Sequence, residues 1–194
     1  VCSSDLPVLR MQRFAACVEY DGAAFCGWQV QAGQRTVEAV LLEALGRVAD
    51  QPTEAICAGR TDSGVHAVGQ IIHFDSPVRR SARAWLLGTN ANLPDDVALH
   101  WVRPVPEHFH ARYSALSRTY RYRILNRAAR SALARGRAWW LHGALDIDAM
   151  HRTARHLLGE HDFSAFRAAG CQSHSPVRRL DALEVSREDR KSVV

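Results

Sequence analysis

The strongest constraint on the fold is a helical repeat of apolar side chains that follows a strand-like run. In residues 37–50, VEAVLLEALGRVAD, apolar residues recur at spacings of three and four, and Thr36 precedes them as an expected N-cap. Before this repeat, residues 13–20 have the pattern of a buried strand, and residues 21–28 have that of a loop punctuated by glycine. An amphipathic helix next to a strand requires a sheet on which to pack.

The same two patterns continue through the first half of the chain. Strands are predicted at residues 53–58, 69–76 and 96–105, and a second helix is predicted at 81–93. The resulting order, β-α-β-β-α-β, is that of the α+β ferredoxin-like (RRM-like) fold, an antiparallel sheet with two helices on one face. We expect residues 12–104 to form this domain.

A partial second copy of this order is expected in residues 105–194. The patterns predict a strand at 117–125, a helix at 146–160 and a strand at 178–187. Because a last helix and strand are missing, this second ferredoxin-like half with its antiparallel sheet would be incomplete. The two tryptophans at 139–140 are expected to close its core.

The composition argues against a membrane protein, a disulfide-linked protein and a zinc protein. The chain has 194 residues, of which 47% are hydrophobic and 23% charged, and shows no signal-peptide pattern and no run of about 18 apolar residues. We therefore expect a cytoplasmic protein without a membrane segment. The five cysteines are scattered and never spaced C-x-x-C, so neither a disulfide framework nor a zinc site is suggested. The chain begins without methionine, and we expect it to be a fragment.

Charge is unevenly distributed along the chain. Residues 1–102 carry a net charge of −3 and residues 103–194 a net charge of +8. Residues 110–137 hold eight arginines, three tyrosines and no acidic residue. Guanidinium groups suit phosphate oxygens, and aromatic rings accept unstacked bases, so this composition favours a nucleic-acid contact over a plain solvated face.

The candidate site is the stretch AGRTDSGVH, residues 58–66, between two predicted strands. Gly59 and Gly64 are expected to give the loop φ freedom, so that Asp62 can project from the sheet edge. Arg60 shares a face with Asp62 in an extended segment and would keep the carboxylate ionised, as a nucleophile or a general base. The residues alone leave open a second interpretation, a turn aspartate in a surface ion pair.

Five sequence blocks resemble the tRNA pseudouridine synthase A family, in that family's order and at its spacing. They are YDGAAFCGWQVQ (20–31), AGRTDSGVHAVGQIIHF (58–74), NANLPDDV (90–97), FHARYSALSRTYRYRI (109–124) and LLGEHDFSAFR (157–167). The resemblance covers roughly residues 13–185. Beyond that point the family continues into a further helix and strand, so the chain resembles a member shortened at its C-terminus.

The resemblance implies a function and a set of site residues. The reaction is the isomerisation of uridine to pseudouridine in the anticodon stem-loop of tRNA, at positions 38–40, with no metal and no organic cofactor. The family's essential aspartate falls on Asp62, its partner arginine on Arg60, and the tyrosine that contacts the target base on Tyr120. Arg112 and Arg118 would supply phosphate contacts. The resemblance also implies that the protein forms a homodimer, as members of the family do.

Two other functions stay open at this stage. The tripeptide at residues 62–64 is the D-[ST]-G of aspartic proteases, but a charged Arg60 opposes the proton sharing between two carboxylates that those enzymes require. A non-catalytic RNA-binding module of ferredoxin-like fold would need only the basic stretch. The aromatic strand signature of the common RNA-recognition domain is absent from the sequence.

Overall fold

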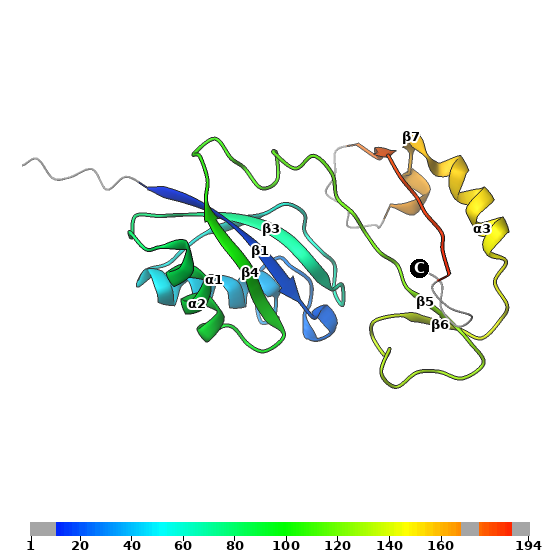
Figure 1. Ribbon diagram of the computed structural model, residues 1–194, viewed down its shortest axis with the longest axis horizontal. Coiled ribbons are helices and arrows are strands. Elements are labelled where there is room, and N and C mark those ends of the chain that lie inside the picture. Colours follow the sequence, from blue (N-terminus) through cyan, green and yellow to red (C-terminus); the bar gives the residue numbers. More distant parts are fainter. Residues whose placement is uncertain (1–10, 168–174, 188–194) are drawn as a thin grey trace, which may run out of the picture. The chain divides into compact units, whose positions relative to one another are not determined.

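The computed structural model describes residues 11–167 and 175–187 (Figure 1). Contacts divide the chain into two compact units, Val1–Thr119 and Tyr120–Val194. In the part of the chain that is described, no helix is long and apolar enough to cross a membrane.

The first unit is built around a four-stranded antiparallel sheet in the order β2-β3-β1-β4. Its strands are β1 (Gln12–Tyr20), β2 (Ala55–Cys57), β3 (Ala67–Ser76) and β4 (Val97–Pro104), and its helices are η1 (Gly22–Ala24), α1 (Val37–Ala49) and α2 (Ala82–Asn92). The predicted order β-α-β-β-α-β and the antiparallel sheet are confirmed for this half.

Both long helices begin where the sequence predicts, but they are capped differently. Ser81 Oγ accepts a hydrogen bond from the Ala84 N–H (3.1 Å), as an N-cap does. Thr36 makes no such bond, and its buried hydroxyl has no hydrogen-bond partner among the described residues. Thr36 is therefore the N-cap residue, as predicted, but its side chain does not cap the helix. The N–H groups of Val37 and Glu38 donate instead to the Gly27 and Trp28 carbonyls, at 3.2 and 3.0 Å.

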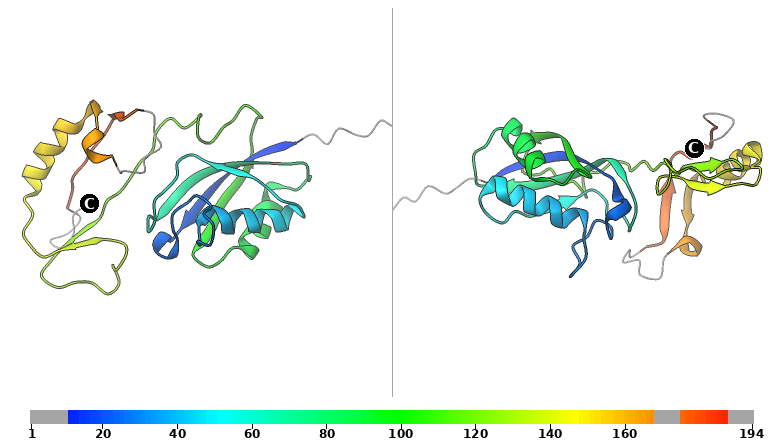
Figure 2. Two further views of the ribbon diagram at one scale, coloured as in Figure 1. Left: turned by 180° about the vertical axis from the view of Figure 1, so that it is seen from behind. Right: turned by 90° about the horizontal axis from the view of Figure 1, so that it is seen from below.

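The core of this unit lies between the sheet and the helices. Alternate residues of β1 are buried there, among them Phe14, Ala16 and Val18. The Phe14 ring stacks on Phe74 with centroids 5.4 Å apart, and Phe74 meets Trp85 of α2 at 4.9 Å. Both helices thus pack on one face of the sheet, and α1 lies in front of the strands when the molecule is viewed from behind (Figure 2, left).

The chain that follows β4 is tied back across the other face of the sheet. Arg13 forms an ion pair with Asp75 (Nη2 to Oδ2, 2.6 Å), and its Nη1 donates to the Phe109 carbonyl (2.8 Å). The Ala111 N–H donates to Nδ1 of the buried His73 (3.1 Å). These contacts attach the start of the basic stretch to the sheet.

The described residues of the second unit form two separate strand pairs and one α-helix. Its elements are β5 (Ile124–Asn126), β6 (Trp139–Leu141), α3 (Ile147–Ala154), η2 (Arg155–Leu157), β7 (Gly159–Asp162), η3 (Ser164–Phe166) and β8 (Val177–Leu180). β5 pairs with β6 in parallel and β7 with β8 antiparallel. A single antiparallel sheet, as expected for a second copy, is therefore not formed by the described residues of this unit.

The predicted strand at 117–125 is reduced to its last two residues. Only residues 124–126 find a pairing partner, and the arginines and tyrosines before them are exposed, so no buried side fixes them as a strand. The strand predicted at 178–187 ends at Leu180 for the same lack of a partner. The helix predicted at 146–160 begins as expected but ends at Ala154.

The two tryptophans expected to close a core are not buried. Trp139 is 54% and Trp140 is 42% exposed, and the Trp140 indole N–H donates to the Arg127 carbonyl (2.9 Å). Both tryptophans lie in the short strand β6. Among the described residues of this unit, no helix and no second sheet packs against β6 to bury them. The prediction of a tryptophan core is wrong.

Replacing Trp85 by alanine is expected to lower the free energy of unfolding by about 3–5 kcal/mol, because its indole is fully buried against Phe14 and Phe74. Leu87→Ala on the same helix is the matched control, since Leu87 is 52% exposed and should change the value by under about 0.5 kcal/mol. Urea unfolding followed by circular dichroism measures both. Equal losses in the two variants would contradict this packing.

The buried His73 is expected to make stability depend on pH. Burial lowers its pKa, and the positive charges of Arg13 and His110 lower it further, while Asp75 opposes them. The unfolded chain, with a histidine pKa near 6.5, then binds the proton more tightly than the folded chain. The stabilisation is complete above about pH 6.5 and is lost as the pH falls through the lower folded pKa.

The variant His73→Gln keeps an acceptor for the Ala111 N–H but does not titrate. Urea midpoints measured between about pH 7.5 and pH 5 should fall more steeply for the wild-type chain than for this variant. Parallel slopes in the two proteins would show that His73 is not responsible.

Candidate catalytic loop

The predicted site lies on the loop that joins β2 to β3, residues 58–66, and Asp62 is exposed near its middle. Gly64 has a φ of 77°, which confirms the expected use of glycine at that position. Gly59 does not have a positive φ, so the freedom expected of it is not used. The space around Gly59, and not its φ, accounts for glycine at this position.

Hydrogen bonds from β3 hold the start of the loop. The Ala58 N–H donates to the Ile71 carbonyl (2.7 Å), and the Gly59 N–H donates to Gln70 Oε1 (3.3 Å). Gln70 Nε2 in turn donates to the Gly59 carbonyl. The buried Gln70 amide therefore satisfies both backbone groups of a single loop residue and fixes the direction in which the chain leaves β2.

The segment after β1 holds the residue before the aspartate. The Trp28 N–H donates to the Thr61 carbonyl (2.9 Å), and the Tyr20 hydroxyl shares a hydrogen bond with Thr61 Oγ1 (2.8 Å). Tyr20 and Trp28 are both buried in the core. The backbone immediately before Asp62 is thus bonded to the hydrophobic core of the unit.

Phe25 holds the two residues after the aspartate. Its carbonyl accepts hydrogen bonds from the Ser63 hydroxyl (3.2 Å) and the Gly64 N–H (3.3 Å). The Arg35 guanidinium lies 3.9 Å from the centroid of the Phe25 ring and makes two hydrogen bonds of 2.8 Å with Asp96. The loop is therefore supported on both sides of its exposed carboxylate.

Two glycines allow the segment after β1 to approach the loop this closely. A Cβ placed on Gly22 would lie 1.9 Å from the Val65 carbonyl oxygen, and one on Gly27 would lie 2.9 Å from the Thr61 carbonyl oxygen. Gly27 also has a φ of 89°. Glycine is required at both positions because backbone there meets backbone.

Asp62 and Arg60 both expose their side chains to solvent. Within the described structure no hydrogen bond or ion pair joins these two side chains, and their predicted pairing stays a prediction. Burial raises the pKa of the neighbouring Cys57 thiol to about 11, so this thiol stays protonated at neutral pH.

The other predicted site residues are placed as follows. Arg112 is exposed in the segment after β4, and Tyr120, 77% exposed, is the first residue of the second unit. Arg118 lies at the candidate catalytic loop, where its guanidinium donates to the Ala58 carbonyl. The sequence singles out this arginine but not its contact, because composition does not distinguish a guanidinium that binds phosphate from one that binds a backbone carbonyl.

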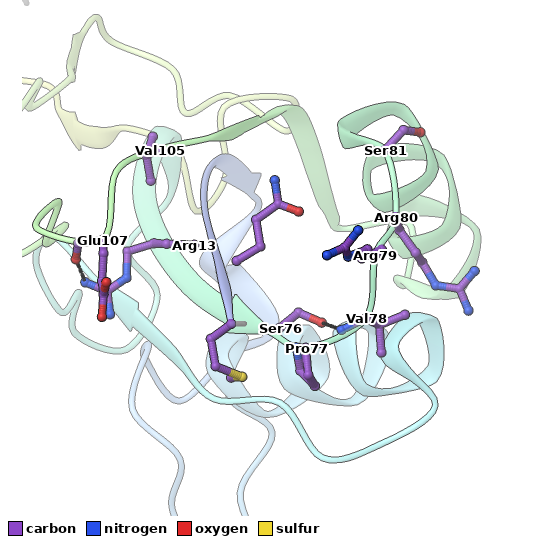
Figure 3. Close-up of a pocket in the computed structure, with 11 residues that line it drawn as sticks. Arg13, Ser76, Pro77, Val78, Arg79, Arg80, Ser81, Val105 and Glu107 are labelled. Atoms are coloured by element: carbon purple, nitrogen blue, oxygen red, sulfur yellow. Dashed lines mark hydrogen bonds between the residues drawn. The ribbon is translucent and has the colours of Figure 1, made fainter. Parts of the chain in front are cut away.

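A hollow of about 590 Å³ lies at the other end of β3 (Figure 3). Residues from the start of β1, the end of β3 and the entry to α2 line it, among them Gln12, Ser76 and Arg79. β3 runs from Ala67, next to the candidate catalytic loop, to Ser76 at the hollow. No lining residue belongs to residues 58–66, so the hollow is separate from the candidate site.

Comparison with known proteins identifies the family. A sequence model described as tRNA pseudouridine synthase matches residues 16–114 and 153–194. The chain is 54% identical over 182 residues to a tRNA pseudouridine synthase A of Methylococcus capsulatus, a match that covers 94% of this chain and 67% of the relative. A protein of the same name from Dechloromonas aromatica is 53% identical over 173 residues, covering 89% of this chain and 66% of the relative.

The chain belongs to the tRNA pseudouridine synthase family, a family of isomerases. It spans about two thirds of the length of the curated relatives that it matches. The resemblance found in the five sequence blocks is thereby confirmed, and the matched ranges include the whole of the candidate catalytic loop.

Replacing Gly22 by alanine is expected to destabilise the first unit by about 1–3 kcal/mol, because the added methyl group would overlap the Val65 carbonyl and force two backbones apart. Gly69→Ala is the matched control: its Cβ would meet only Cys17 Sγ, at an ordinary 3.7 Å. Urea unfolding of the two variants measures the difference. A Gly22→Ala variant as stable as Gly69→Ala would mean that the two loops are not in contact.

Proposed function

We propose that this chain is an aspartate-dependent tRNA pseudouridine synthase, which isomerises uridine to pseudouridine in the anticodon stem-loop of tRNA, at positions 38–40. The relatives named tRNA pseudouridine synthase A are 47–54% identical to it. The observation that carries the proposal is the setting of Asp62, an exposed carboxylate on a loop whose backbone is bonded immediately before and after it.

The reaction makes clear why a carboxylate on a fixed backbone is useful. The bond from C1′ to N1 of uridine breaks, the uracil turns, and a bond from C1′ to C5 forms, while C5 loses a proton and N1 gains one. The base must leave the helical stack to react. Asp62 acts as the nucleophile or the general base, and a loop held from both sides keeps its carboxylate in position while the base turns.

Three further residues have proposed roles. Arg60 keeps the carboxylate of Asp62 ionised until the substrate arrives. Tyr120, whose ring is largely exposed, stacks on the extruded base. Arg112, exposed in the basic stretch, contacts a phosphate without reading sequence. The proposed reaction uses no metal and no organic cofactor.

The proposal extends to the architecture. Residues 12–104 form a ferredoxin-like domain, which the strand order β2-β3-β1-β4 and the two helices on one face support. Residues 105–194 form the basic second domain. We further propose a cytoplasmic enzyme that acts as a homodimer, as expected from the family resemblance.

A non-catalytic RNA-binding module is the second candidate function. The observation in its favour is the exposure of the arginines and tyrosines in residues 118–123, which would bind RNA whether or not Asp62 reacts. The aspartic protease considered from the D-S-G tripeptide finds no support, because the family that the chain matches modifies RNA.

Transfer RNA tritiated at uridine C5 tests the proposal, because the reaction releases that hydrogen. The 194-residue chain is expected to release tritium, and Asp62→Asn should lower the rate at least about a hundredfold while leaving tRNA affinity nearly unchanged. Asp95→Asn, at an exposed carboxylate outside the loop, is the control and should react like the unmodified chain.

The two candidate functions differ in outcome. Binding of tRNA that weakens steeply with salt, without tritium release from either protein, would favour the non-catalytic module. Release that persists in Asp62→Asn would rule out the proposed role of this aspartate.

A further inference from the structure

Arg118 makes a two-pronged contact with the backbone of the catalytic loop. Its Nε and Nη2 both donate to the Ala58 carbonyl, at 3.1 and 2.5 Å. The Ala58 N–H is already bonded to the Ile71 carbonyl of β3 (2.7 Å). Both backbone groups of the first loop residue are therefore satisfied, one by the sheet and the other by a side chain sixty positions further along the chain.

Gly59 makes room for this contact. An added Cβ would lie 2.9 Å from Nε and 3.3 Å from Cδ of Arg118, closer than side chains ordinarily pack. Since Gly59 does not need a positive φ, the space taken by Arg118 is the physical reason for glycine at this position. The glycine and the arginine form one structural pair.

An arginine side chain is well suited to fix the position of a backbone carbonyl. A guanidinium is charged at every working pH and offers donors in a rigid fork, whereas a lysine offers a point charge on a flexible stem. In the described structure the ion pairs do not include Arg118. Its hydrogen bonds to protein therefore serve the loop backbone and not a carboxylate.

We propose that Arg118 is a positioning residue, which holds the start of the catalytic loop through the Ala58 carbonyl and thereby fixes the place from which Asp62 acts. This inference rests on the proposed function for its consequence in catalysis but not for the contact itself. It differs from the role expected of Arg118 as a phosphate contact, and the two roles predict different measurements.

Hydrogen exchange in the free 194-residue protein tests the contact without any reaction. Arg118→Met, which keeps the length of the side chain but removes its donors, should raise the exchange rate of amide protons in residues 58–66 about fivefold or more. Arg83→Met, at an exposed arginine of α2, is the control and should leave these rates unchanged. Unchanged loop exchange in Arg118→Met would overturn the proposal.

A double-mutant cycle tests whether Arg118 and Gly59 act together. Gly59→Ala should displace the guanidinium and raise loop exchange as Arg118→Met does. The double variant should then resemble either single variant, because the same contact is lost in all three. Effects that add in the double variant would mean that the two residues act independently, and would also overturn the proposal.

Single-turnover tritium release with saturating tRNA separates positioning from binding. Arg118→Met should slow the reaction about tenfold or more with little change in the Kd for tRNA, and Arg118→Lys, which keeps the charge but not the fork, should not restore the rate. Arg112→Met, at a proposed phosphate contact, should instead raise the Kd. A raised Kd in Arg118→Met that Arg118→Lys restores would identify a phosphate contact in place of a positioning role.

The outcomes keep the two proposals distinct. If the unmodified chain binds tRNA but releases no tritium, the proposed function fails, whereas the exchange measurements still decide whether Arg118 holds the loop.

Discussion

The contact between two backbones, at Gly22 and Val65, is the constraint on which the candidate site depends. Segments that follow β1 and β2 meet there with no side chain between them. This approach brings the Phe25 carbonyl and the Trp28 N–H within hydrogen-bond distance of residues next to Asp62. The loop is therefore positioned by a neighbouring loop and, through Tyr20 and Trp28, by the core.

The first unit could be predicted almost completely from its sequence, because each element there buries one face. The helical repeat after Thr36 and the alternation of residues in β1 each indicate which side chains of the element face the core. What could not be predicted was the hydrogen bonding of polar groups: the Gln70 amide at Gly59, the Arg118 guanidinium at Ala58, and the lack of a partner for the Thr36 hydroxyl among the described residues. Such bonds join positions far apart in sequence, where no periodicity reports them.

The second unit was predicted poorly for a related physical reason. An alternating pattern such as that at 117–125 becomes a strand only if a partner strand and a covering layer are present. The described residues give β5 and β8 one short partner each, and the tyrosines and tryptophans of this half stay largely exposed. The position of Asp62 was nevertheless predicted correctly as an exposed loop residue, because two predicted strands and the glycine at 64 defined its turn.

The shortness of β2 has a consequence for the accuracy of folding. Only three residues of this edge strand pair with β3, from Ala55 opposite Phe74 to Cys57 opposite Ile72. A slip by one residue would send every side chain of the strand to the opposite face, and three pairs alone resist such a slip weakly. Just past the strand, the Ala58 N–H donates to the Ile71 carbonyl and the Gly59 N–H donates to Gln70 Oε1, both on β3. These bonds add to the three pairs, so the start of the loop also contributes to the pairing at the edge of the sheet.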